Sequence, residues 1–447
     1  MNLPTKYQVM SISYLRSKLK PGISKFTKTR RRLLIFLVSF GLAFGLAILP
    51  VWTQQPVVIK TLIRADEAQQ LQPLAKKFNQ QHPKIKFEIV EAPSDSNQVE
   101  DLYTSSFLLG NSPYDVVYMD IVWTPKFAAA GWLENLSDRF SDEDAKAYLK
   151  GDIAGGMYQD KLYRLPFRSD AGMLYYRQDL LAQAGYEPPR TFTELLEISQ
   201  DLQQQKLIDW GYVWQGKQYE GLAAMFVEIL QGNGGFWVNP DTLEVGLDRR
   251  EAIAAVEFLQ SAIAAKISPP GVTTYAEEET RLLFQNGKAA FLRNWPYVYS
   301  LAADSAIAGK YKIKPMVHAP GENSGATLGG WGLGIASSSN NPDAAWEVIK
   351  FLSSQESQRQ FILETGFVPS RIALFNDPQI VDKYDYYPQL LEVVQSSALR
   401  PPIPQYAQAS DILQRYLSAA ITGKMTSKQA MQTAAKETRN LLGVSPG

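Results

Sequence analysis

Three carboxylates stand where strand-like segments of the sequence give way to the next element. Glu67 follows the first of these segments, Asp120 ends the third, and Asp170 lies where the chain is expected to pass between two lobes. Ligands of open α/β sheets bind beyond the carboxyl ends of strands, so all three acids are expected to face one cleft. Ionised carboxylates make strong charge-assisted hydrogen bonds with hydroxyl groups. The alternative is that each acid caps a helix N-terminus.

Three tryptophans, Trp123, Trp295 and Trp331, occupy the same kind of place in the sequence. Glycines flank Trp331 in LGGWGLGIASSS, so its chain neighbours offer it only backbone and leave room for a ligand on the ring. Flat rings cover the C–H faces of a pyranose, and carboxylates bind its hydroxyls, so the combination predicts a sugar site. In the alternative, Trp123 seats its helix, and Trp295 and Trp331 belong to the core.

Several other chemistries are excluded or disfavoured. There is no cysteine, and the two histidines, His82 and His318, stand beside no nucleophile or second ligand. The acidic run 277–279 lacks the alternating ligands and glycine of a calcium loop, so we expect a solvated helix face there. The glycines of 330–334 are not followed at once by a helix, which argues against dinucleotide binding. We therefore expect no metal, no cofactor and no catalytic residue.

Charge is unevenly distributed along the 447 residues. The chain has 45 basic and 45 acidic residues, but residues 1–32 hold nine Lys or Arg and no acid. The remainder is therefore mildly acidic, which argues against nucleic acid as a partner.

A long apolar run, residues 33–50, follows the basic stretch and carries no charge. It is long enough to cross a bilayer, with 1–32 expected on the cytoplasmic side and the rest exported to the periplasm or the outer face of the plasma membrane. A cleaved signal peptide and an uncleaved anchor both fit, and the missing A-x-A site favours the anchor. A buried core helix is the third alternative.

Strand and helix patterns alternate beyond residue 56. Apolar patterning predicts strands over 56–65, 84–92 and 114–120, with an amphipathic helix over 66–83. This order and the chain length predict an α/β protein of two lobes. Further along, Thr191 and Glu194 predict a capping box at a helix start.

Seven segments, in this order, resemble the extracellular solute-binding proteins of family 1, the carbohydrate receptors of ABC importers. The segments are FNQQHPKIKFEIVEAP, YDVVYMDIVWTPKFAAAGWLENLSD, KLYRLPFRSDAGMLYYRQDLL, PPRTFTELLEIS, FQNGKAAFLRNWPY, GGWGLGI and GFVPSR. The resemblance covers nearly everything after residue 56. Within that family the chain is most similar to the trehalose/maltose-binding proteins.

The resemblance implies the two-lobed periplasmic-binding-protein fold of type II, each lobe a mixed sheet flanked by helices. The implied N-terminal lobe is 56–167 with 297–366, and the C-terminal lobe is 168–296 with 367–447. The crossing segments are then expected near 167–170, 293–296 and 366–370.

The resemblance also implies roles at matching positions. Glu67, Asp120 and Asp170 fall where the family binds sugar hydroxyls, and Trp295 and Trp331 fall where it stacks rings on the sugar. Gly330 falls where a backbone group faces the ligand, and Arg400 where a guanidinium reaches it.

One position departs from the pattern of the trehalose/maltose-binding proteins. They carry an aromatic residue two places before the cleft aspartate, and here that residue is Arg168. An arginine there adds hydrogen-bonding capacity and removes a ring. The expected ligand is therefore an α-glucoside or disaccharide of the trehalose, sucrose, maltose or glucosylglycerol type.

The implied function is that of a monomeric receptor that closes on a sugar and delivers it to the membrane permease of an ABC importer. Two alternatives remain open at this point. One is an exported glycosidase that uses two of the three acids, and the other is a sugar-sensing module without a transport partner.

Overall fold

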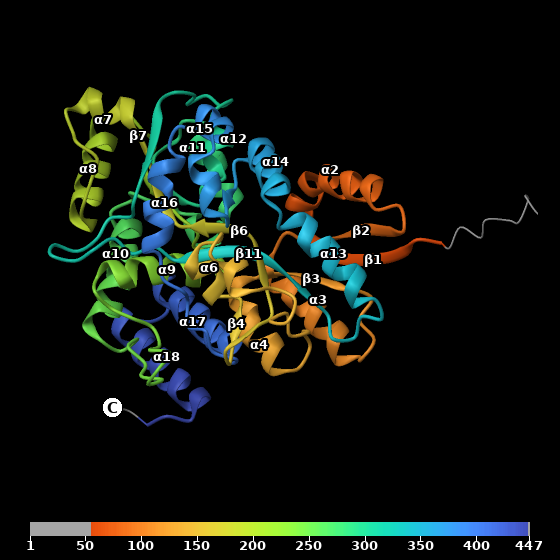
Figure 1. Ribbon diagram of the computed structural model, residues 1–447. Helices are drawn as coiled ribbons and strands as arrows, with labels where there is room; N and C mark the ends of the chain where they lie inside the picture. The colour runs from red at the N-terminus through yellow and green to blue at the C-terminus, as the bar shows by residue number, and fades with distance from the viewer. Residues whose placement is uncertain (1–54, 446–447) are drawn as a thin grey trace, which may run out of the picture. The chain divides into compact units, whose positions relative to one another are not determined.

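Two β-sheets organise the described residues, 55–445, of the computed structural model (Figure 1). The larger sheet has the order β12-β6-β11-β3-β1-β2 and the smaller one β10-β7-β9-β8. The strands of the larger sheet are β1 (Val57–Arg64), β2 (Ile85–Ala92), β3 (Val116–Asp120), β6 (Leu165–Ala171), β11 (Leu328–Ile335) and β12 (Val368–Pro369). Those of the smaller sheet are β7 (Met173–Arg177), β8 (Trp210–Val213), β9 (Ala289–Asn294) and β10 (Tyr311–Lys314). A two-stranded ribbon, β4 (Met157–Tyr158) with β5 (Lys161–Leu162), stands apart from both.

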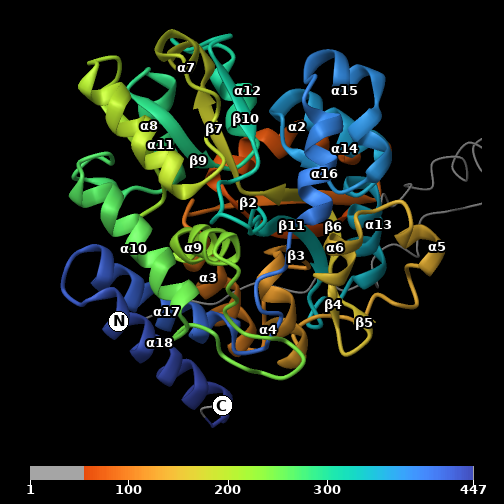
Figure 2. The same ribbon diagram turned by 90° about the vertical axis from the view of Figure 1, so that its left-hand side faces the viewer.

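Helices connect and cover the strands. In chain order the α-helices are α2 (Ala65–Gln81), α3 (Ser96–Leu108), α4 (Thr124–Ala129), α5 (Asp142–Ala145), α6 (Lys150–Ala154), α7 (Gln178–Ala184), α8 (Phe192–Gln204), α9 (Glu220–Gly232), α10 (Arg250–Ala264), α11 (Glu277–Gln285), α12 (Val298–Ala302), α13 (Pro342–Leu352), α14 (Gln355–Thr365), α15 (Pro378–Lys383), α16 (Tyr387–Ser396), α17 (Tyr406–Ile421) and α18 (Ser427–Leu442). Three 3-10 turns are η2 (Ile121–Trp123), η3 (Val272–Thr274) and η4 (Ile372–Asn376). Helices α10, α17 and α18 pack together beside α9 (Figure 2).

The pairing of the larger sheet brings its strand ends to one edge. β1 pairs in parallel with β2 and β3, and β11 runs antiparallel to β3 and β6. Parallel β1 and β3 therefore end on the same side of the sheet, and β11 begins there. Every residue of β3 and β11 is buried, as expected for central strands with helices on their faces.

The sequence predicted much of this architecture correctly. The two-lobed α/β fold is confirmed, and β1, β2, β3 and α2 occupy the segments in which they were expected. The capping box of α8 also forms, because Thr191 Oγ1 accepts the N–H of Glu194 at 3.1 Å and Glu194 accepts the N–H of Thr191 at 3.3 Å.

Strand pairing departs from the predicted lobe division at three points. β6 stays paired with β11 as far as Ala171, so the chain leaves the larger sheet at Gly172 rather than at 167. β12 belongs to the larger sheet because Val368 pairs with Ser169. β10 belongs to the smaller sheet because it pairs with β7. Hydrogen-bond partners far away in the sequence decide these memberships.

The basic segment 1–32 and the apolar run 33–50 lie outside the described residues. Within residues 55–445, no helix has both the length and the apolar character needed to cross a membrane.

A buried ion pair joins α9 to the smaller sheet. Arg293 on β9 and Glu228 on α9 are both fully buried, and Arg293 Nε donates to Glu228 Oε2 at 2.7 Å. A second Arg293 nitrogen, Nη1, donates to Gln215 Oε1 at 3.1 Å. Because an unpaired buried charge is costly, each partner depends on the other.

Replacing Glu228→Gln should therefore lower the free energy of unfolding by about 3–5 kcal/mol, since it leaves the Arg293 guanidinium buried without its carboxylate. Urea unfolding followed by circular dichroism measures the effect. The control is Asp209→Asn, which breaks the exposed Lys288–Asp209 pair of the same sheet and should cost less than about 1 kcal/mol. Equal losses in the two variants would contradict the assignment.

Candidate functional site

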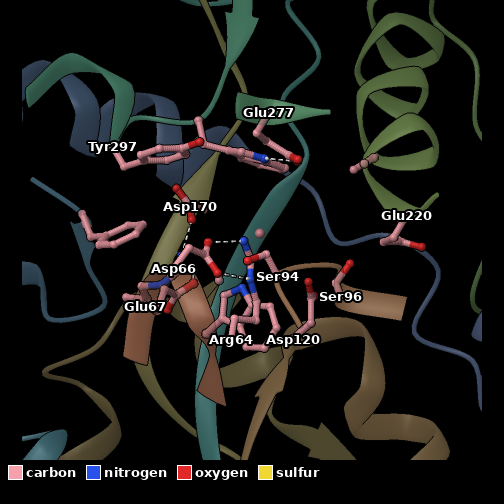
Figure 3. Close-up of a pocket in the computed structure, with 18 of the residues that line it drawn as sticks. Arg64, Asp66, Glu67, Ser94, Ser96, Asp120, Asp170, Glu220, Glu277 and Tyr297 are labelled. Carbon is pink, nitrogen blue, oxygen red and sulfur yellow. Dashed lines mark hydrogen bonds and ion pairs between the residues drawn. The ribbon is translucent and has the colours of Figure 1, made fainter. Parts of the chain in front are cut away.

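A cavity of about 240 Å³ opens beyond the carboxyl ends of β1 and β3, and Figure 3 shows side chains converging on it from both sides. Of the residues singled out from the sequence, eight line it: Glu67, Asp120, Arg168, Asp170, Trp295, Gly330, Trp331 and Arg400. Their positions in one cavity do not by themselves fix their roles, which depend on the contacts described next.

The elements explain why these residues meet. Glu67 lies in the first turn of α2, directly after β1, and Asp120 is the last residue of β3. Trp331 pairs with Asp120 across β11 and β3, and Gly330 pairs with Ser169 on β6. Neighbouring strands of one sheet therefore deliver the acids and the indole to the same edge.

Arg168 holds two of the predicted acids in a buried cluster. Its Nη2 donates to Glu67 Oε1 at 2.5 Å, its Nε donates to Glu67 Oε2 at 3.3 Å, and its Nη1 donates to Asp170. Tyr118 adds its hydroxyl to Glu67 Oε2 at 2.5 Å. Beneath, the Phe367 ring centroid lies 4.3 Å from the Arg168 guanidinium carbon. The arginine thus orients both acids.

The two acids of this cluster respond differently to burial. Burial alone would raise the pKa of Glu67, but Arg168, Arg64 and the hydrogen bonds outweigh it and hold that pKa below its ordinary value. Burial raises the pKa of Asp170 to about 6, because Arg168 is shared with Glu67 and attracts Asp170 too weakly to compensate.

Arg400 forms a second cluster on the other side of the cavity. It donates through Nη2 to Asp120 Oδ1 at 2.9 Å and through Nη1 to Glu220. Glu220 also accepts the hydroxyls of Tyr406 and of Ser410, the latter at 2.6 Å. Asp120 additionally caps η2 by accepting the N–H of Val122 at 3.2 Å, so its predicted capping role coexists with its place in the cavity.

Trp331 has more neighbours than its flanking glycines suggested. Its ring is 4% exposed and stacks on Tyr118 with centroids 5.0 Å apart, and Trp123 meets it edge-on at 5.2 Å. The guanidinium carbons of Arg64 and Arg168 lie 5.4 and 5.8 Å from its centroid. The flanking glycines were expected to leave room for a ligand on this ring, but side chains from β3, β6, η2 and the end of β1 surround it.

The glycines beside Trp331 make room for the protein's own groups. Gly330 has φ +126°, and a Cβ there would lie 2.7 Å from the carbonyl oxygen of Arg168. A Cβ on Gly332 would lie 2.5 Å from Nε of the buried Arg164. The glycine pattern thus reflects close packing of β11 against β6 and the side chains beneath it.

Trp295 is half-buried and borders the cavity with a supported ring. The Arg293 guanidinium carbon lies 4.1 Å from its centroid, and its Nε1 donates to Glu277 Oε1 at 3.2 Å. Glu277 also accepts the Tyr219 hydroxyl at 2.5 Å. The ring is therefore fixed in orientation from behind and at its edge, as a stacking surface requires. Trp123, in contrast, is a core residue that does not line the cavity.

Several lining residues escaped the sequence analysis. They include Arg64, Asp66, Gln70, Ser94, Ser96, Glu220, Glu277, Tyr297 and Phe367. Arg64 and Asp66 flank Glu67, so the same strand-end argument applies to them. The acidic run was predicted to be a solvated helix face, but Glu277 and Glu278 line the cavity. No local signal in the sequence marks Glu220.

Three residues that line the cavity each carry a buried polar atom without a hydrogen-bond partner within the described part of the chain. The atoms are the acceptors Gln70 Oε1 and Asp170 Oδ1 and the donor Arg400 Nε. An unsatisfied buried polar atom is unfavourable, so these atoms are suited to a ligand that offers hydroxyl groups. Residues 55–445 contain no group of three or more His, Cys, Asp and Glu able to hold a metal ion.

The sequence and the structure are similar to those of several known proteins. The sequence model of a family described as bacterial extracellular solute-binding protein matches residues 64–359. A probable ABC transporter-binding protein of Deinococcus radiodurans is 31% identical over 357 residues, 77% of this chain and 84% of that protein. A maltotriose-binding protein of Pyrococcus abyssi is 26% identical over 78% of this chain and 74% of that protein. The structure of maltose-bound MalE3 of T. maritima is similar with a TM-score of 0.82 and 37% identity, covering 86% of this chain and 100% of that one.

Replacing Trp331→Ala should lower the free energy of unfolding by about 3–5 kcal/mol, because it empties a packed site between Tyr118 and Trp123. Chemical denaturation measures this loss. The comparison variant is Trp295→Ala, which removes a half-buried ring and should cost less than half as much. Similar, small losses in both variants would show that Trp331 is not a packed residue.

Asp170 should make stability depend on pH. Its native pKa of about 6 lies above its ordinary value of 3.8, so the native state binds the extra proton between these pH values. The contribution is therefore fully present below pH 3.8 and is lost as the pH rises through 6. The free energy of unfolding of the wild type relative to Asp170→Asn should fall by about 2.4 kcal/mol from pH 4 to pH 7. Denaturant titrations at both pH values test this, and a difference that stays constant would contradict it.

Proposed function

This chain belongs to the bacterial extracellular solute-binding protein family, and from that premise we propose that its cavity captures an α-glucoside of about disaccharide size for delivery to an ABC permease. Members of this family are solute-binding receptors of transporters and not enzymes, so the glycosidase alternative is set aside. They act outside the cytoplasmic membrane. We also propose that residues 33–50 attach the protein to the membrane and that the protein is a monomer.

The observation that carries the proposal is the combination of Trp295 with the three unpartnered polar atoms. A half-buried ring, supported from behind by Arg293, offers a surface for the C–H face of a sugar. Gln70 Oε1, Asp170 Oδ1 and Arg400 Nε offer two acceptors and one donor to hydroxyl groups of the same molecule. A sugar is a ligand that presents both kinds of surface within a small volume.

The volume of the cavity and the ligands of similar proteins support an α-glucoside as the ligand. A cavity of about 240 Å³ suits a small ligand rather than a long oligosaccharide. The similar proteins from P. abyssi and T. maritima are a maltotriose-binding protein and a maltose-bound MalE3. Arg168 pairs with both Glu67 and Asp170 and so makes this wall more polar than a ring would. Trehalose, sucrose and glucosylglycerol are therefore proposed beside maltose.

Delivery requires that the lobes close on the ligand. The proposed hinges are the segments in which the chain passes between the sheets, at Gly172 between β6 and β7 and over residues 315–327 between β10 and β11. Closure excludes water from the cavity, and the permease then recognises the closed form.

Calorimetric titration of the full chain with maltose, trehalose, sucrose and glucosylglycerol tests the proposal. We expect saturable binding of at least one of them. Trp295→Ala should weaken that binding more than tenfold, about 1.4 kcal/mol, because it removes the stacking surface. No binding anywhere in the panel would overturn the proposed ligand class.

The matched control is Trp210→Ala. Trp210 is a half-buried tryptophan on β8 of the same smaller sheet, and it does not line the cavity. It should leave affinity within about twofold of the wild type. Equal losses for both tryptophans would mean that Trp295 acts through the fold. If the protein binds sugar but its deletion leaves sugar uptake by cells intact, the sensing alternative replaces the transport role.

A further inference from the structure

The cavity wall carries a large excess of negative charge. Its carboxylates are Asp66, Glu67, Asp120, Asp170, Glu220, Glu277 and Glu278, and its guanidinium groups are Arg64, Arg168 and Arg400. Lysine and histidine are absent from this wall as far as the described residues go. Resting on the proposed function, we propose that the site selects its sugar by charge: it rejects phosphorylated sugars and uronic acids and tolerates a protonated amine in place of a hydroxyl.

Each of the three arginines already contacts a carboxylate of the protein, so none is free to bind an anionic ligand. Arg168 contacts Glu67 and Asp170, and Arg400 contacts Asp120 and Glu220. The side chains of these two arginines are only 4% and 2% exposed. A phosphate that recruited either of them would leave a buried carboxylate without its cation, which is strongly unfavourable.

Arg64 is the most accessible of the three and is also committed. It donates through Nε to Asp66 Oδ1 at 3.1 Å and through Nη2 to Asp66 Oδ2 at 2.5 Å. This two-point contact uses the edge of the guanidinium that a phosphate would otherwise engage. One face of its guanidinium lies over the Trp331 ring, whose centroid is 5.4 Å from the guanidinium carbon. The pair therefore presents a compensated charge to the cavity.

On the opposite side of the cavity, the first turn of α11 adds two carboxylates, and neither forms an ion pair with a lining arginine. Figure 3 places Glu277 and Tyr297 across the cavity from Arg64 and Asp120. Glu277 accepts hydrogen bonds from Trp295 and Tyr219, which are uncharged donors. Glu278 contacts Arg281 at 3.0 Å and accepts the Tyr297 hydroxyl at 3.0 Å. An anionic ligand would meet Glu277 in a confined, weakly screened space.

The test compares each neutral sugar with its charged derivatives by calorimetry on the full chain. The probes are trehalose, sucrose and maltose, the phosphate monoester of each, and 6-amino-6-deoxytrehalose. For every sugar that binds, we expect the phosphate to bind at least thirtyfold more weakly, and the amine to bind no more than threefold more weakly than trehalose. A phosphate that binds as tightly as its parent, or more tightly than the amine, overturns the proposal.

A charge-neutralising double variant tests whether the carboxylates of α11 cause the selection against phosphorylated sugars. Glu277→Gln with Glu278→Gln should reduce the ratio of neutral-sugar to phosphate affinity at least fivefold. The control is Glu279→Gln on the same turn: Glu279 is exposed, does not line the cavity and only caps the helix, a role that glutamine keeps. Because the readout is a ratio within one protein, a general loss of affinity does not imitate the effect.

The outcomes separate this inference from the proposed function. Binding of neutral sugars with equal binding of their phosphates retains the receptor and removes charge selection. An unchanged ratio in the double variant, or an equal change in Glu279→Gln, removes the role of α11. If none of the probes binds, both the proposed sugar class and this inference are overturned.

Discussion

The structure depends on the rule that a buried charge needs a partner. Arg168, Arg400 and Arg293 are almost fully buried, and each is matched by carboxylates from other segments. Arg168 joins α2 to β6, Arg400 joins β3 to α9, and Arg293 joins β9 to α9. These pairs fix the edges of the cavity, so the wall that faces the ligand is set by interactions within the protein before any ligand arrives.

The same pairing explains how a crowded acidic wall remains selective. Most of the carboxylates are already oriented and partly neutralised by arginine, and buried polar atoms without a partner remain on Gln70, Asp170 and Arg400. Trp295 and Trp331 also differ in how far the protein's own side chains surround them. Trp331 is enclosed by rings and guanidinium groups, whereas Trp295 is supported from behind and half-buried. One tryptophan builds the wall and the other borders the space inside it.

The sequence predicted what depends on local order. Strand ends placed Glu67, Asp120 and Asp170 at one edge, and the resemblance added Arg168, Gly330 and Arg400; all of them line the cavity. Contacts between segments that are distant in the sequence could not be predicted in this way. Tyr118 reaches Trp331 only because β3 and β11 are neighbours, and Glu220 reaches Arg400 across 180 positions of sequence. The glycines around Trp331 misled for the same reason, since the groups they accommodate come from β6 and Arg164.

Arg400 carries a consequence for how the cavity exchanges with solvent. Its guanidinium is held at once by Asp120 on β3 and Glu220 on α9, and burial raises the pKa of Glu220 against the attraction of Arg400. Any movement that draws β3 away from α9 must leave one of these carboxylates without its cation until water takes its place. The proposed opening of the cleft is therefore a hydration step as well as a rotation, because water must reach the Arg400 guanidinium as its carboxylate leaves.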